Sequence, residues 1–223
     1  MTLSEQKAAI LLLMDYAVNE EDQAQARKLV EHYAGDAIAL HVFHEFYSYL
    51  PDAENDAIRI LRCLDKKGGN FLLAATTCRD TYLYLANSEG AEFLGDHRDG
   101  IWDEEVLAYF GVTREQALAK FKDLDSFPVN VPVHLNPNLC LACAVEHGEL
   151  HRLGCPVEVC PWCGGQLTRC NCRFSEAGVD QFASEIQLEK FIEALESKGR
   201  IPFDAAEQRI GFGDTHEGGE NSD

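Results

Sequence analysis

The cysteines of this chain are concentrated in one segment, residues 140–172, which holds seven of the nine. Two C-x₂-C pairs, Cys140 with Cys143 and Cys160 with Cys163, lie sixteen residues apart. This spacing is typical of a zinc site, because two thiolates on one tight turn occupy two corners of a tetrahedron and a second turn supplies the other two. We therefore predict a zinc ion bound by these four cysteines.

Three further cysteines leave the ligand set open. Cys170 and Cys172 would point to the same face of a strand, so both could join Cys160 and Cys163 at one metal or form a second site. Cys155 could replace one ligand, and otherwise these three are small buried residues near the metal. His147 or His151 could also supply a nitrogen ligand or contact a ligand from behind. We expect instead that both lie on the surface of a hairpin.

The chain around these cysteines is compatible with short strands. Residues 149–153 and 156–159 can pair, and residues 166–174 can add a third strand, which is the order of a zinc ribbon. The stretch Cys-Pro-Trp-Cys-Gly-Gly-Gln-Leu, followed by Cys170 and Cys172, resembles the tails of bacterial proteins of unassigned function that end in C-P-x-C-G-G-Q-L-x-x-C-x-C. The resemblance covers only the cysteine segment and implies metal binding without a known activity.

An enzyme that uses the cysteines is the first alternative. Cys160-Pro-Trp-Cys163 also resembles the C-P-x-C redox motif of glutaredoxin-like proteins. That motif needs a helix whose N-terminus lowers the pKa of the first thiol, and Gly164-Gly165 starts a helix poorly. A metal-dependent enzyme needs an open coordination position, which four thiolates do not leave. The sequence therefore favours a non-catalytic protein, and we assign no catalytic residue.

Charge separates the remaining possibilities. The formal net charge is −19, and residues 131–175 are the only part in which basic and acidic side chains balance. A nucleic-acid-binding ribbon would depend on Arg152, Arg169 and Arg173, but so negative a field repels phosphate backbones. The same field attracts basic surfaces. We expect an interaction protein with a basic partner, such as an inhibitor or immunity-like protein.

Location follows from cysteine use and hydropathy. Cysteines at metal-ligand spacing favour a reducing compartment over a secreted disulfide framework. The apolar run at residues 8–14 has no basic start, and no stretch approaches the length of a membrane span. We expect a cytoplasmic protein without a membrane segment.

The N-terminal residues show helical patterns. A capping box at Thr2 and Glu5 starts the first predicted helix, and further helices are predicted over about 21–34, 37–50 and 53–66. Gly68-Gly69 would stop the last of them, and the short links predict a small bundle. His41 and His44 lie one turn apart, but two ligands fall short of a zinc site.

The pattern changes after residue 70. Two strands at 81–86 and 91–94 predict a hairpin, and helices follow over 103–110 and from Thr113 to about residue 123. Residues 128–135 carry two prolines and alternating valines, so they are extended. An amphipathic helix is predicted over 182–197.

The predicted fold class is therefore α+β. A helical bundle with a small hairpin and helix portion occupies residues 1–130, and a zinc ribbon occupies 131–175. A closing amphipathic helix lies in 176–210, and the glycine-rich acidic tail 211–223 is expected to be disordered.

Overall fold

The computed structural model describes residues 2–51 and 55–208. They begin with helices α1 (Leu3–Ala17), α2 (Glu20–His32) and α3 (Ala37–Tyr49). A sheet follows, made of strands β1 (Ile60–Lys67), β2 (Asn70–Thr76), β3 (Thr81–Ala86) and β4 (Ala91–Asp96). The remaining elements are helices α4 (Glu104–Phe110), α5 (Arg114–Lys120), α6 (Cys172–Ala177) and α7 (Glu185–Lys198), with short 3₁₀ turns at Leu124–Ser126 and Val133–Leu135. The α+β class is confirmed.

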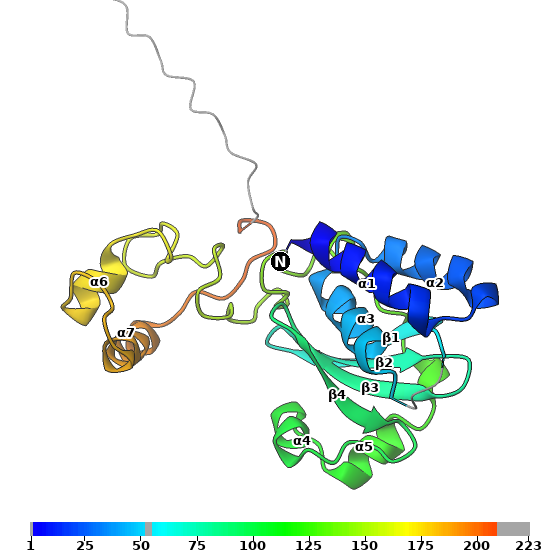
Figure 1. Cartoon of the computed structure of the whole chain (residues 1–223). Coiled ribbons are helices and arrows are strands. Elements are labelled where there is room, and N and C mark those ends of the chain that lie inside the picture. The colour runs from blue at the N-terminus through cyan, green and yellow to red at the C-terminus, as the bar shows by residue number, and fades with distance from the viewer. Residues whose placement is uncertain (1, 52–54, 209–223) are drawn as a thin grey trace, which may run out of the picture.

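The sheet is an antiparallel meander in the order β1-β2-β3-β4, with helices on both faces. Figure 1 shows α1, α2 and α3 on one side of the sheet and α4 and α5 on the other. In β2, Phe71 and Leu73 join the core under α3, whereas Leu72 and Ala74 join the core under α4 and α5. Because both faces are covered, β2 reads as a continuous apolar run and does not alternate.

Side chains at the helix starts account for the helices that the sequence predicts. Thr2 forms a complete capping box with Glu5, and Thr113 forms a second one with Gln116. At the third helix, Asp36 accepts hydrogen bonds from the backbone N–H of Ile38 and Ala39. Each cap satisfies amide groups that have no partner within the helix.

The helix predicted over 53–66 is wrong, because strand β1 begins at Ile60. Its apolar residues contact both faces of the sheet, since Leu61 joins one core and Leu64 the other. When both faces of a strand are buried, apolar residues three or four positions apart also occur in a strand, so this spacing does not distinguish it from a helix. Gly68 and Gly69 do not end a helix; they form the two-residue hairpin turn into β2, with φ values of 55° and 76°.

An extended segment leads from the sheet to the cysteines. The backbone N–H of Asn130 donates to the carbonyl of Leu61 at 2.8 Å, so this segment lies along the edge of β1. The Tyr33 hydroxyl donates to the carbonyl of Asn130 at 2.6 Å, and the Val133 N–H donates to the buried Asp36 carboxylate at 3.2 Å. The extended structure predicted for residues 128–135 is thus confirmed at its start and gives way to a 3₁₀ turn at its end.

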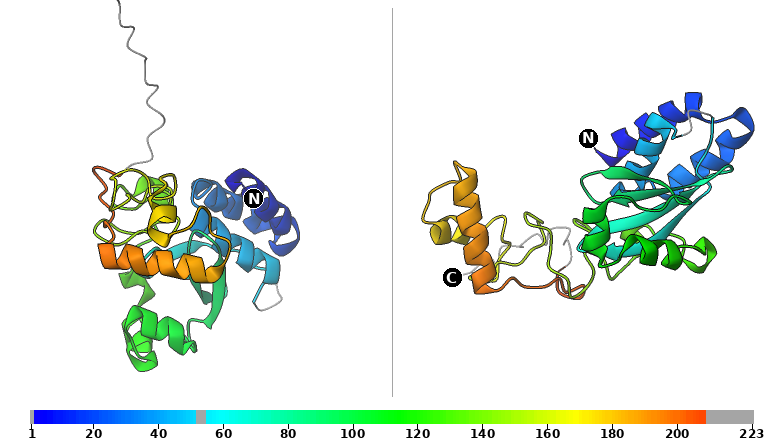
Figure 2. Two further views of the ribbon diagram at one scale, coloured as in Figure 1. Left: turned by 90° about the vertical axis from the view of Figure 1, so that its left-hand side faces the viewer. Right: turned by 90° about the horizontal axis from the view of Figure 1, so that it is seen from below.

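The cysteine segment does not contain the three predicted strands. Its backbone forms tight turns, with single bridges joining Leu139 to Glu146 and Val159 to Gln166. The third expected strand, residues 166–174, instead leads into helix α6. The right-hand view in Figure 2 shows this segment and α7 beside the N-terminal sheet and helices. The tail predicted at 211–223 lies outside the described residues.

A glycine allows the cysteine segment to lie directly against the sheet. A Cβ atom added at Gly69 would overlap the carbonyl oxygen of Cys143. The same hairpin donates from the Gly68 N–H to the Glu149 carboxylate at 2.9 Å, and that carboxylate also accepts from the Glu146 N–H at 2.8 Å. The β1–β2 turn therefore positions the first cysteine turn.

We predict that Gly69→Ala destabilises the protein more than Gly111→Ala does. Both glycines have φ near 70°, so alanine costs about 1–2 kcal/mol of backbone strain at either position. At Gly111 an added Cβ meets nothing within 4 Å, whereas at Gly69 it meets a backbone carbonyl. Urea unfolding of the two variants measures the difference, and equal losses of unfolding free energy would contradict this contact.

Candidate metal centre

Four metal-ligating side chains meet in a buried group, called here the first cluster: Cys140, Cys143, His151 and Cys155. Their ligand atoms all lie within 4.8 Å of one another. The Cys140 and Cys155 sulfur atoms are 3.8 Å apart, and His151 Nδ1 lies 3.3 Å from the Cys143 sulfur. A tetrahedral ion with metal–sulfur bonds near 2.3 Å places its sulfur ligands about 3.8 Å apart. The cluster has the dimensions of one tetrahedral site.

Two turns bring these residues together. The Ala144 N–H donates to the Cys140 carbonyl at 2.8 Å, and the Cys140 N–H donates to the Val145 carbonyl at 2.9 Å. Ala144 adopts φ 59°, an uncommon conformation for a residue with a Cβ. Farther along, the Cys155 N–H donates to the Arg152 carbonyl at 3.0 Å. The first turn aims two sulfurs at the site and the second supplies the third.

The side chain of Gln208 orients the His151 ring by contacting the nitrogen that faces away from the cysteines. Its Nε2 lies 2.8 Å from Gln208 Oε1, while the Gln208 amide nitrogen donates to the Pro202 carbonyl. Since an amide oxygen only accepts, Nε2 carries the proton and Nδ1 faces the thiols. Burial lowers the pKa of His151, but hydrogen bonds with Cys140 and Cys143 outweigh it and raise the pKa to about 10. A metal ion at Nδ1 therefore displaces a proton.

A second cluster follows directly in the chain: Cys160, Cys163, Cys170 and Cys172. The Cys160 N–H donates to the Gly165 carbonyl at 2.7 Å, which closes the turn that carries the first two sulfurs. Helix α6 begins at Cys172. The cluster packs against a small core that includes Leu167, Phe191 and Leu195, so α7 lies against the metal-binding turns.

The thiols shift one another's pKa values in opposite directions. Hydrogen bonds with Cys143 and Cys155 hold the pKa of Cys140 well below its usual range, whereas the hydrogen bond with Cys140 raises the pKa of Cys155. In the second cluster, the hydrogen bond with Cys163 raises the pKa of Cys172 to about 12. Thiols this close do not all ionise unaided, and a divalent cation supplies the charge that lets each bind as a thiolate.

The structure does not bring the four sequence-predicted ligands into one group. Cys140 and Cys143 lie in the first cluster, and Cys160 and Cys163 lie in the second. Each pair is completed by residues that the sequence offered only as alternates or, in the case of His151, placed on a hairpin surface. The signal for this division is the order of the ligands, C-x₂-C-x₇-H-x₃-C followed by C-x₂-C-x₆-C-x-C.

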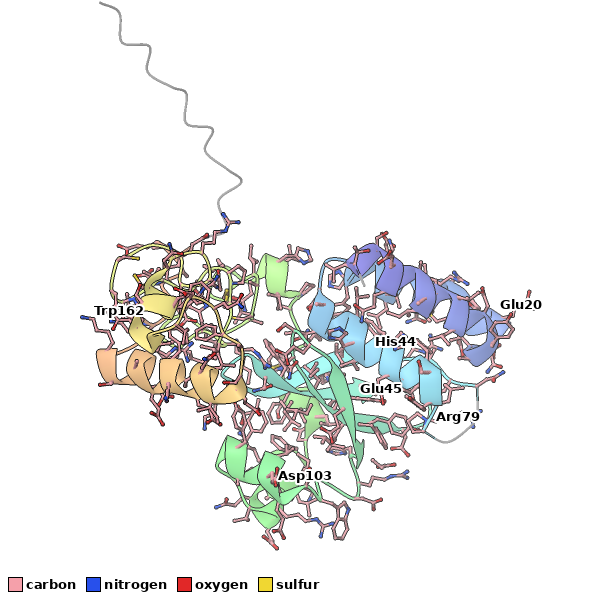
Figure 3. The ribbon with its side chains drawn as sticks, turned by 60° about the vertical axis from the view of Figure 1, so that its left-hand side comes forward. Glu20, His44, Glu45, Arg79, Asp103 and Trp162 are labelled. Carbon is pink, nitrogen blue, oxygen red and sulfur yellow. The ribbon has the colours of Figure 1, made fainter. Side chains whose placement is uncertain are left out.

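The other histidines considered from the sequence lie elsewhere. His147 Nδ1 accepts from the Ala205 N–H at 3.2 Å, and His41 Nδ1 lies 3.1 Å from the Asn87 carbonyl. Figure 3 shows His44 and Glu45 on α3 and Trp162 on the cysteine segment. Neither His41 nor His44 belongs to a group of metal-ligating side chains in the part of the chain that the structure describes.

Comparisons with protein-family models, curated proteins and solved structures find no match for this chain. The likeness of residues 160–172 to bacterial tails therefore remains a resemblance. Among residues 2–51 and 55–208, no helix combines the length and the apolar character needed to cross a bilayer.

We predict that Gln208→Ala weakens metal binding at the first cluster by about 10–100-fold, because the acceptor that orients His151 is lost. Gln208→Glu keeps an oxygen opposite Nε2 and serves as the matched control. Competition titration with a chelator measures both affinities. If the alanine and glutamate variants bind metal equally well, Gln208 does not orient the histidine.

Proposed function

We propose that this chain binds two zinc ions, one in each cluster, and that both ions are structural. The observation that carries this proposal is that each cluster supplies four ligand atoms within 4.8 Å of one another. Sets of four thiolates, or three thiolates and one imidazole, are those of structural zinc sites. Four protein ligands complete a tetrahedron, so neither ion keeps a position for water or substrate.

A structural role is also favoured over thiol redox catalysis. After Cys163 the chain continues through Gly164 and Gly165, and the next helix begins at Cys172. Cys160 therefore lacks the helix N-terminus that activates the first thiol of a redox C-P-x-C motif. Because thiolate ligands stay reduced in the cytoplasm, we place the protein there.

The zinc-bound segment serves, in this proposal, to present an acidic surface to a basic protein partner. Helix α7 exposes four glutamates, Glu185, Glu189, Glu193 and Glu196, against two exposed lysines, Lys190 and Lys198. Nucleic acid fits less well, because Arg152 is already held by Glu89 at 2.9 Å and by the Asn70 side chain at 3.3 Å. A non-catalytic binding protein, inhibitor or immunity-like, is the function that these features support best.

We predict two zinc ions per chain in protein purified without added metal. Cys155→Ser removes one ligand of the first cluster and Cys170→Ser one ligand of the second, so each variant should retain one tightly bound ion. Elemental analysis of wild type and both variants measures the stoichiometry.

A single ion per chain that survives both substitutions would instead support one site made of Cys140, Cys143, Cys160 and Cys163. Cobalt substitution tests whether the sites are closed. The ligand-field spectrum of Co²⁺ in a closed site should not change when azide is added, and a change would reveal an open position.

Association with a basic partner should weaken steeply with salt, because exposed charges are screened over about 8–10 Å at physiological ionic strength. The measurement is retention of captured proteins on the immobilised full chain over a salt gradient. A partner that is held equally well at low and high salt would contradict an electrostatic acidic surface.

A further inference from the structure

The two clusters differ in their exposure to solvent. All four ligands of the first cluster are buried. In the second cluster only Cys160 is fully buried, Cys170 and Cys172 are partly exposed, and Cys163 is exposed. If both hold zinc, solutes in water reach the sulfur atoms of only one of them.

The turn beside Cys163 explains this exposure. Gly164 and Gly165 follow it and have no side chains to cover the sulfur. A Cβ added at Gly164 would meet no atom within 4 Å, and one added at Gly165 would approach only the Cys163 sulfur, at 3.6 Å. Thiolate oxidation follows exposure of the sulfur, so Cys163 is the ligand that a small oxidant meets first.

We propose that Cys163 is a peroxide-oxidation site whose reaction releases the ion of the second cluster. The inference rests on the proposed function, since it requires zinc bound there. The Cys163 thiolate attacks one peroxide oxygen, the O–O bond breaks, and the departing oxygen takes up a proton and leaves as water. Cys163 is then a sulfenic acid.

Cys172 is the thiol best placed to complete the reaction. Its sulfur lies within 4.8 Å of the Cys163 sulfur and is partly exposed, whereas Cys160 is buried. The Cys172 thiolate attacks the sulfenic sulfur, the S–O bond breaks, and the oxygen leaves as a second water after protonation. Two thiolates, two protons and one hydrogen peroxide thus give one disulfide and two waters, and the ion keeps only two ligands.

Loss of this ion would remove the support on which helix α7 packs. The core beside the second cluster is small, and Trp162 contacts Phe191 of α7 with ring centroids 6.3 Å apart. Helix α6 has six residues, too few to be stable alone. Once the disulfide draws Cys163 and Cys172 together and the ion leaves, α7 has lost the framework on which it packs.

The test uses the full zinc-loaded chain carrying Trp102→Phe, which leaves Trp162 as the single tryptophan. Hydrogen peroxide is added in the presence of a chromogenic zinc indicator. We expect one equivalent of zinc to be released at least about tenfold faster than the second, because oxidation follows sulfur exposure. Trp162 emission should shift to longer wavelength, mass spectrometry should find a Cys163–Cys172 disulfide, and thiol reductant with zinc should reverse both changes.

The matched control compares the two one-site variants. Cys155→Ser keeps the second cluster and should release its ion rapidly, whereas Cys170→Ser keeps the first and should retain its ion. Equal release rates from the two sites, no release with peroxide, or a disulfide within the first cluster would overturn this inference. A chain that contains no zinc before peroxide is added would instead overturn the proposed function.

Discussion

Two sets of four candidate metal-ligand atoms lie in the C-terminal third of the described chain. Between Leu139 and Cys172 the backbone forms turns joined by single bridges, so no sheet fixes the path of the chain there. Binding of structural zinc contributes about 10–16 kcal/mol in small zinc-binding peptides, which matches or exceeds the whole stability of a typical domain. Side chains that ligate a metal can therefore add to the two small cores of this segment, one that includes Val145 and Phe203 and one that includes Leu167 and Phe191.

Other contacts fix the two clusters relative to each other and to the sheet. Glu158 lies between the clusters in the chain, and its carboxylate is only 1% exposed. Arg200, which follows α7, donates to it at 2.8 Å and also donates to the carbonyl of His151 at 2.5 Å. Burial raises the pKa of Glu158, and the guanidinium opposes that shift by favouring the carboxylate. One arginine thus links the end of α7 to the first cluster, while Gly69 sets that cluster on the β1–β2 turn.

The sequence was informative where one local signal decides the structure. The capping boxes at Thr2 and Thr113 predict helix starts, and the β3–β4 hairpin is predicted by two strand-like runs on either side of the turn residues 87–90. Strand β1 is not predicted from the sequence because both faces of the sheet are covered, so apolar and polar residues do not alternate along the strand. The division of the ligands into two clusters is not predicted, because two ligand pairs of one zinc site can be separated by sixteen residues, as Cys143 and Cys160 are, or by six, as Cys163 and Cys170 are. Only the folded turns decide which sulfurs meet.

Because the ligands of one cluster all precede those of the other in the chain, the two clusters can change independently. Each cluster draws its ligand atoms from its own stretch of the chain, residues 140–155 or 160–172, so the two clusters share no ligand. The buried first cluster adjoins the sheet through Gly69, whereas the partly exposed second cluster supports α7. In Figure 2, α7 lies on the side of the cysteine segment away from the N-terminal sheet and helices. A chemical change at the second cluster can therefore alter the acidic helix while the first cluster keeps the segment attached to the sheet.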